Sequence, residues 1–242
     1  MGFIGKQPTP SPLTASDIED GIITNAKLAQ DIISGETALG AEPADTDEFL
    51  VSDAGTLKRM DYSYIKGGGR YTLISTATIS GGTTYIDMDD VISDTYKNYL
   101  LVVTGIDVNS DGADLHIQVK NSSGLINGAS DYEYSYIQRH TNSSSTSTAY
   151  DVGQDYFRLN ASGVGNAAVE NANIILEIPN ARSTSHYKIL NSKMTAFGTS
   201  TNGTINFGVG TVETTTALTG LRLKTSTGNL DAGVLKLYGA ND

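Results

Sequence analysis

Residues 114–120 read Asp-Leu-His-Ile-Gln-Val-Lys, in which Leu115, Ile117 and Val119 alternate with polar residues. Successive side chains of a β-strand point to opposite faces of its sheet, so this alternation predicts a strand with one apolar and one polar face. Asn-Ser-Ser-Gly follows at residues 121–124, and Asn and Gly favour the positive φ angles of a tight hairpin turn. The stretch therefore predicts antiparallel β structure.

The same kind of pattern extends in both directions, from Tyr71 to the end of the chain. Strands at this spacing, with no helical pattern between them, are typical of an all-β domain, and we expect a jelly-roll-like β-sandwich over residues 70–242. The expected strands are Tyr71–Ile79, Asn98–Ile106, Asp114–Lys120, Tyr132–Arg139, Tyr156–Asn160, Asn173–Ile178, Tyr187–Phe197, Thr204–Val209, Leu218–Lys224 and Val234–Tyr238.

The composition of the chain narrows the functions that it can have. Its 242 residues carry 16 Lys and Arg against 27 Asp and Glu, and a formal net charge of −11 disfavours nucleic acid as a partner. The absence of Cys removes disulfides, thiolate metal sites and thiol nucleophiles. The longest apolar runs, such as residues 99–103, fall far short of the roughly 20 residues that cross a bilayer. We expect no nucleic-acid partner, no membrane insertion and no cofactor.

Residues 1–15 predict an extended arm. Three closely spaced prolines favour polyproline-like backbone that has no core of its own. A disordered terminus is one interpretation of such an arm. The other is an arm that becomes ordered when it docks on another protein, because the arm alone cannot bury the two apolar side chains near its start. The expected anchoring residues are Phe3, Ile4, Pro8 and Pro10.

Residues 16–34 predict a short helical neck. Ser16 and Glu19 have the spacing of a capping box, and apolar residues follow at steps of three and four. A lone helix of this length is marginal in water, so its apolar stripe predicts association with copies of itself. The expected association residues are Ile18, Ile22, Ala26, Ala29 and Ile33.

Residues 35–69 predict a small module built on a β-hairpin. Phe49-Leu-Val and Leu57-Lys-Arg-Met are the expected strands, joined by a loop of three to five residues around Gly55. The apolar surface of this module is too small for an independent fold. Gly67-Gly-Gly then forms the expected hinge to the β-rich remainder.

Several phrases of the chain resemble the fibre proteins of tailed bacteriophages, especially those of marine phages. The resemblance covers nearly the whole chain, from the N-terminal module to the β-sandwich. The phrases that carry it are Phe-Ile-Gly-Lys-Gln-Pro at 3–8, Gly-Ile-Ile-Thr-Asn-Ala-Lys-Leu-Ala at 21–29, the run from Glu42 to Tyr62, Ala-Ser-Asp-Tyr-Glu-Tyr-Ser-Tyr at 129–136 and Gly-Val-Leu-Lys-Leu-Tyr-Gly at 233–239.

The resemblance implies a parallel homotrimer on the virion. The arm would bind a phage tail or capsid protein, and the sandwich would form a head that binds a host-surface receptor, either a glycan or a protein. A head fibre, decoration protein or collar adaptor with a purely structural role is the alternative. A glycan depolymerase is a third interpretation, but the chain lacks the long β-helix that such phage enzymes generally carry.

Tyrosines alternate along one expected strand of the head, at Tyr132, Tyr134 and Tyr136. Two interpretations are open for them. Aromatic faces stack on sugar rings, so these tyrosines could contact a receptor together with Arg139, His140 and Tyr150. Alternatively, a row with a period of two forms the buried face of its strand, and the tract Thr141–Thr148 is an exposed loop.

The run from Asp107 to Gly112 matches the opening of a calcium-binding loop, with Asp107, Asn109 and Asp111 as candidate ligands. Gln118 stands where such a loop has its bidentate Glu, so an Asx-rich turn with positive φ at Gly112 is the other interpretation.

Catalytic motifs are lacking in the sequence. The three histidines are spread over separate expected strands and loops, and neither a His-Glu-x-x-His nor a Gly-x-Ser-x-Gly motif occurs. We expect a protein that is not an enzyme.

Overall fold

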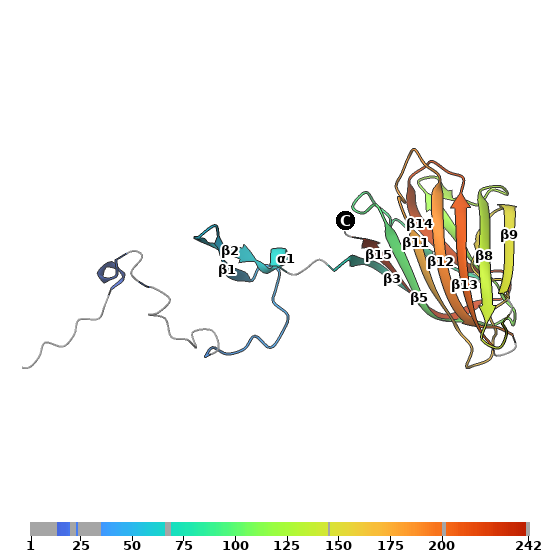
Figure 1. Cartoon of the computed structure of the whole chain (residues 1–242), viewed down its shortest axis with the longest axis horizontal. Coiled ribbons are helices and arrows are strands. Elements are labelled where there is room, and N and C mark those ends of the chain that lie inside the picture. Colours follow the sequence, from blue (N-terminus) through green and yellow to red (C-terminus); the bar gives the residue numbers. More distant parts are fainter. Residues whose placement is uncertain are drawn as a thin grey trace, which may run out of the picture. The chain divides into compact units, whose positions relative to one another are not determined.

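Strands dominate the computed structural model of the chain, which describes residues 14–19, 23, 35–65, 69–144, 146–199 and 202–240 (Figure 1). The chain divides into two compact units, Met1–Gly67 and Gly68–Asp242. No helix among the described residues is long and apolar enough to cross a membrane.

The described residues of the first unit form one β-hairpin, which confirms the predicted one. Strands β1 (Glu48–Asp53) and β2 (Thr56–Asp61) pair antiparallel, and the short helix α1 (Tyr62–Ile65) follows. The connection is shorter than the predicted three to five residues, because Ala54 and Gly55 alone make the turn with φ angles of 48° and 85°. Two successive positive φ angles define the turn whose twist matches that of paired strands.

The described part of the predicted neck is not helical beyond one turn. A 3-10 helix, η1, spans Ala15–Asp17, and the Asp17 carboxylate accepts hydrogen bonds from the backbone N–H and the hydroxyl of Thr14, each at 2.7 Å. Thr14 and Asp17 therefore cap this turn. Ile18 follows this turn with its side chain exposed.

Most of the residues predicted for the arm and the neck lie outside the described residues. These are Phe3, Ile4, Pro8 and Pro10 of the arm, and Ile22, Ala26, Ala29 and Ile33 of the neck.

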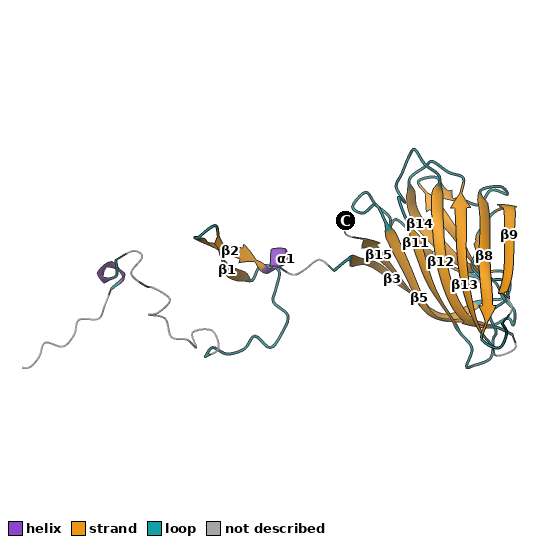
Figure 2. Cartoon of the chain, in the orientation of Figure 1, coloured by secondary structure: helices purple, strands orange, loops and turns teal. Residues whose placement is uncertain are grey.

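The second unit, which we call the head, consists of two antiparallel sheets (Figure 2). The larger sheet has eight strands, which lie in the order β3-β15-β5-β11-β12-β13-β8-β9. Their bounds are β3 Tyr71–Ile79, β15 Leu230–Ala240, β5 Tyr99–Val108, β11 Ala172–Ile178, β12 Lys188–Phe197, β13 Gly203–Val212, β8 Tyr132–His140 and β9 Thr146–Gln154.

The smaller sheet has five strands. Four lie in the order β10-β6-β14-β4, and β7 pairs with β6 outside this path. Their bounds are β10 Phe157–Arg158, β6 Leu115–Asn121, β14 Leu218–Thr225, β4 Tyr85–Met88 and β7 Gly124–Leu125.

All ten strands predicted for the head are present, and the all-β class is confirmed. The short strands β4 and β7 were not predicted. Strand β9 was not predicted either. Residues 146–148, which were expected in an exposed loop, belong to this edge strand, which pairs with β8. Strand β9 forms through its backbone hydrogen bonds to β8, although nearly all of its side chains are exposed.

One hydrophobic core lies between the two sheets. Side chains from both sheets belong to it, including Leu101 and Leu237 of the larger sheet and Ile117 and Leu223 of the smaller one. Phe157 on β10 is fully buried and lies 6.1 Å, between ring centroids, from Tyr134 on β8. These contacts give the head its own source of stability.

Strand β6 has the predicted apolar and polar faces, and both of them are largely buried. Its apolar residues enter the core as predicted, but His116 and Gln118 on the other face are also buried. The Tyr156 ring covers His116 at a centroid distance of 3.7 Å, and the Gln118 side chain donates a hydrogen bond to the Asp155 carbonyl at 2.7 Å.

The chain enters the head at the same end of the larger sheet where it leaves. Tyr71 on β3 pairs with Ala240 on β15. At the same end of the sheet, Tyr99 on β5 pairs with Gly239 on β15 and with Ile178, the last residue of β11. Strand β11 begins at Ala172, at the opposite end of the sheet. We call that opposite end the distal end.

Candidate functional site

A hollow of about 340 Å³ lies at the distal end of the larger sheet, on the face turned away from the core. Cross-strand pairing brings Asn173, Thr195, Ile205 and Arg139 into one row across β11, β12, β13 and β8. We call it the distal hollow. It is lined by Arg139, His140, Thr141, Asn171, Asn173, Thr195, Ala196, Phe197, Gly203, Thr204 and Ile205.

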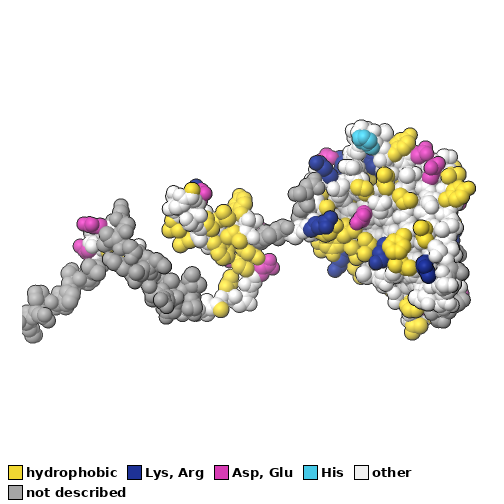
Figure 3. All heavy atoms as spheres, in the orientation of Figure 1, with side chains coloured by type: hydrophobic (Ala, Val, Ile, Leu, Met, Phe, Trp, Pro, Cys, Tyr) yellow, Lys and Arg dark blue, Asp and Glu magenta, His cyan; other side chains and the backbone are white. Residues whose placement is uncertain are grey.

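The alternation of each strand explains why these side chains face outward. On β12 the residues Leu190, Met194 and Ala196 are buried, whereas Thr195 and Phe197 are exposed. Figure 3 shows hydrophobic side chains spread over the outer face of the larger sheet, with basic and acidic side chains between them. The hollow is therefore a surface feature of a rigid sheet, of the size in which small ligands bind.

The end of β8 is fixed by a polar contact that reaches into the interior. Gln138 is buried, and its amide nitrogen lies 2.5 Å from the Ser162 hydroxyl oxygen and 3.2 Å from His140 Nε2. The Arg139 side chain points to the other face and is exposed. In the part of the chain that the structure describes, its guanidinium has no hydrogen-bond or ion-pair partner.

The opposite wall of the hollow is made by the start of β11 and the end of β12. The Asn173 side-chain oxygen accepts a hydrogen bond from the Gly105 N–H at 3.0 Å, and its amide donates to the Asn171 side-chain oxygen at 3.3 Å. The Phe197 N–H donates to the Asn171 carbonyl at 3.1 Å, which fixes its backbone while 41% of the residue stays exposed. The amide nitrogen of Asn171 and the face of the Phe197 ring are left for a ligand.

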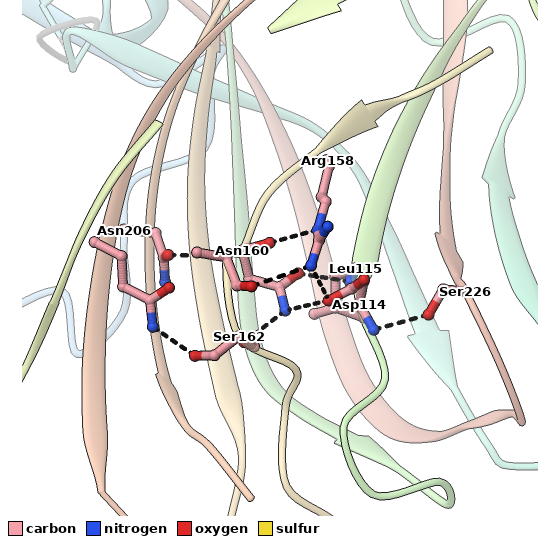
Figure 4. Close-up of polar contacts among 9 residues, drawn as sticks. Asp114, Leu115, Arg158, Asn160, Ser162, Asn206 and Ser226 are labelled. Carbon is pink, nitrogen blue, oxygen red and sulfur yellow. Dashed lines mark hydrogen bonds and ion pairs between the residues drawn. The ribbon is translucent and has the colours of Figure 1, made fainter. Parts of the chain in front are cut away.

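A buried polar network holds the segment that follows β10 beneath this end of the head (Figure 4). Arg158 donates to an Asp114 carboxylate oxygen at 2.9 Å, and the Asn160 amide donates to the same oxygen at 3.2 Å. The Asn160 side-chain oxygen accepts from the Leu115 N–H at 2.8 Å, and Asn206 accepts from the Ala161 N–H at 3.2 Å. Burial raises the pKa of Asp114, although Arg158 and Asn160 oppose that shift.

A second polar cluster covers the outer face of the smaller sheet. Arg222 donates two hydrogen bonds to the Asp87 carboxylate, at 2.7 and 2.8 Å, and Lys120 Nζ lies 2.8 Å from it. Burial acts to raise the pKa of Asp87, but the bonds and charges of Arg222 and Lys120 outweigh it and the pKa lies below its usual value.

His116 belongs to the same face and is nearly inaccessible. Neither ring nitrogen has a hydrogen-bond partner among the described residues. Burial first, and then the charges of Lys224 and Arg158, lower its pKa to about 3. The ring is therefore neutral at ordinary pH and acts as an aromatic packing partner of Tyr156.

The predicted contact residues divide into a buried and an exposed set. Tyr132, Tyr134 and Tyr136 are buried, so their prediction as receptor contacts is corrected, and the interpretation as a buried row is confirmed. Tyr132 has a structural role, because its hydroxyl accepts from the Val119 N–H at 2.8 Å and donates to the Ile126 carbonyl at 2.9 Å.

Arg139 and His140 lie together in the distal hollow. Tyr150 is 78% exposed on β9, but it pairs with Ser135 and does not line the hollow. Sequence reasoning missed Phe197, Asn171 and Asn173, because their nearness to Arg139 depends on the register of four strands.

The run from Asp107 to Gly112 forms a turn with structural contacts. Gly112 has a φ angle of 78°, as the turn interpretation predicts. The Asn109 side-chain oxygen accepts the Asn229 N–H at 2.8 Å and so ties this turn to the β14–β15 connection. Among the described residues, no group of three or more His, Cys, Asp or Glu side chains is placed to hold a metal ion. Asp107 and Asp111 are exposed beside this turn.

One serine–histidine contact lies outside the hollow. Ser185 Oγ is 2.9 Å from His186 Nδ1, and Ser183 Oγ is 3.2 Å from the same nitrogen. These three residues share one exposed turn before β12, and His186 Nε2 has no hydrogen-bond partner in the described ranges. A catalytic base needs a third group to orient it, so this contact by itself defines no catalytic site.

Comparison of the chain with protein-family models, with curated proteins and with solved structures finds no match.

Proposed function

We propose that this chain is a non-enzymatic fibre protein of a tailed-phage virion. In this proposal three parallel copies attach to a tail or capsid protein through the N-terminal arm. A jelly-roll-like β-sandwich head then binds a receptor on the host surface. The sequence resemblance motivates the proposal, and the contrast between the two units of the chain supports it.

The observation that carries the proposal is the exposure of the small hairpin. No described residue of the segment 35–65 is buried, and Leu50 and Leu57 are 76% and 68% exposed. A two-stranded hairpin is at best marginally stable alone in water, so this segment needs a covering partner. Sister chains are the simplest partner, because a closed symmetric assembly covers the same patch on every copy.

The head supports a binding role at its distal end. The chain enters the head at Tyr71, and the distal hollow lies at the opposite end of the strands. A fibre that is attached by its N-terminal arm would therefore present this hollow away from the point of attachment. Three weak sites on one tip would bind a surface far more tightly than one site.

A purely structural role is the second candidate, and one observation favours it. The outer face of the larger sheet exposes apolar side chains on neighbouring strands, among them Ile137, Phe207 and Val209. An apolar face of this kind could cement a neighbouring virion protein, as a decoration protein or collar adaptor does.

Adsorption and localisation separate the two candidates. The purified chain should adsorb to host cells and slow phage adsorption, and cryo-electron microscopy should place it at the host-facing part of the particle. Failure to adsorb, with a location between capsid proteins, would favour the structural role.

The proposed anchor has its own test. Deleting residues 2–12 should leave a folded oligomer that no longer enters particles. Normal incorporation of this deletion would remove the assignment of Phe3, Ile4, Pro8 and Pro10.

A further inference from the structure

Arg139 differs from the other described arginines because no described residue forms a hydrogen bond, an ion pair or a ring contact with its guanidinium. The chain has a net charge of −11, so carboxylates are abundant, and the other arginines each have an ion pair or an aromatic ring. Those contacts are Arg59 with Glu48, Arg70 with the Tyr71 ring, Arg158 with Asp114, Arg182 with Asp94, and Arg222 with Asp87. An exposed guanidinium without a partner from its own chain is free to bind an anion from outside.

The surroundings of Arg139 fit an anion. Among the described residues that line the distal hollow there is no Asp or Glu. Lys193 stands two residues before Thr195 on the same exposed face of β12, and no partner is described for it. A guanidinium binds a carboxylate through two parallel hydrogen bonds, so a carboxylate is the anion that this geometry suits.

The remaining lining fits a sugar ring. The Phe197 ring offers an apolar face, and the Asn171 amide and the Thr195 hydroxyl are donors at the edge of the hollow. Aromatic rings pack on the C–H faces of sugars while amides and hydroxyls bond their oxygens. A simple inorganic anion would leave the aromatic side of the hollow without a contact.

A peptide fits this place less well. The four strands that form the hollow, β11, β12, β13 and β8, are each paired on both sides. Their backbone groups are therefore used within the sheet, and an extended peptide cannot add to them as a further strand. Recognition has to come from side chains, of which the hollow offers one aromatic ring, amides, hydroxyls and a cation.

We propose that the distal hollow binds a carboxylate-bearing sugar, such as a uronic or sialic acid unit of a host-surface polysaccharide. Arg139 binds the carboxylate, Phe197 packs on the ring, and Asn171 and Thr195 bond its hydroxyl groups. This inference rests on the proposed receptor-binding function and names the class of receptor for it.

The test is binding of the full chain to a glycan array. The array carries oligosaccharides that end in uronic or sialic acid, and the same oligosaccharides as methyl esters. Binding should favour the acids over the esters. Arg139→Met should weaken binding of the acids by about tenfold or more, because it removes a charge-assisted pair while keeping the length of the side chain. Phe197→Ala should weaken acids and esters alike.

Lys236→Met is the matched control. Lys236 lies on the same exposed face, on β15, separated from Lys193 on β12 by strands β5 and β11, roughly 15 Å away. Its loss should leave binding unchanged. Equal binding of acids and esters, no binding of any acidic glycan, or an unchanged affinity of Arg139→Met would each overturn the proposal.

Cell adsorption distinguishes this proposal from the function on which it rests. If the wild-type chain adsorbs to host cells and Arg139→Met adsorbs equally well, the sugar site is wrong and the fibre function stands. If protease treatment of the cells abolishes adsorption and periodate treatment does not, the receptor is a protein and the sugar proposal fails. A wild-type chain that does not adsorb at all contradicts the receptor-binding function itself.

Discussion

The head and the first unit place similar residues in opposite environments. In the head, Leu101 and Leu237 are fully buried between two sheets, whereas Leu50 and Leu57 of the hairpin are largely exposed. Both units consist of well-paired antiparallel strands. The difference teaches that strand pairing alone does not bury apolar surface, because a sheet needs a second layer against its apolar face.

The largest expected effect is the loss of a core ring in the head. Phe157→Ala should lower the free energy of unfolding by about 3–5 kcal/mol, because the buried ring leaves a cavity beside Tyr134. Chemical denaturation measures this loss. Phe207→Ala also removes a phenyl ring, but from the outer face, where the residue is 51% exposed. It should lower the free energy of unfolding by about 0.5 kcal/mol or less. Similar losses for both variants would contradict the assignment of the inner and outer faces.

The buried histidine should make the stability of the head depend on pH. The pKa of His116 is about 3 in the folded head and 6.5 for an ordinary histidine, so the unfolded chain binds a proton that the folded one does not. Stability should therefore fall as the pH drops below about 6.5, by up to about 1.4 kcal/mol per pH unit from this group. His116→Phe should flatten that slope in denaturation curves at pH 4 to 7. His186→Phe, at an exposed position, is the control, and an unchanged slope in His116→Phe would contradict the burial of this ring.

The ion-pair cluster on the smaller sheet should contribute less. Asp87→Asn should lower the free energy of unfolding at pH 7 by about 1–2 kcal/mol, because Arg222 loses one of its two acceptor oxygens and the negative charge that it pairs with. The folded pKa of Asp87 is depressed, so this contribution is lost as the pH falls below about 4. The difference between wild type and variant should shrink over that range. Asp53→Asn, which breaks an exposed pair with Lys58 in the hairpin, should have almost no effect on the unfolding of the head.

The smallest effect on unfolding should come from the hairpin itself. Leu50→Asp with Leu57→Asp should leave the unfolding of the head within about 0.5 kcal/mol of wild type. If sister chains cover the hairpin, the same variant should sediment as a smaller species. Ser52→Asp adds a charge without removing an apolar side chain, and should keep the assembly. Loss of head stability in the leucine variant would show that the two units do not fold separately.

Much of the fold was predictable from sequence because the head strands carry a clear alternation. Strand β9 was missed because its side chains are exposed on both faces and its pattern of Ser and Thr is that of a loop. Only pairing with β8 makes it a strand, and pairing partners are not visible in a single sequence.

The candidate site was predictable only in part. The predicted residues Arg139 and His140 do lie in the hollow, but Asn173 and Phe197 come from strands far away in the chain. Their place depends on which strands are neighbours and in which register. The tyrosine row shows a related difficulty. Alternation in the sequence separates the two faces of a strand but does not say which face is buried. Here the tyrosine face is buried because the smaller sheet packs against it.

The pairing of Tyr71 with Ala240 brings the two ends of the head together, so the head can be moved between proteins as a unit. Because both of its ends leave from one corner, the head could be transplanted onto an unrelated stalk, or spliced into a surface loop of another protein, without stretching either junction. Such a graft would show directly whether the head folds and acts without the residues that precede it in this chain.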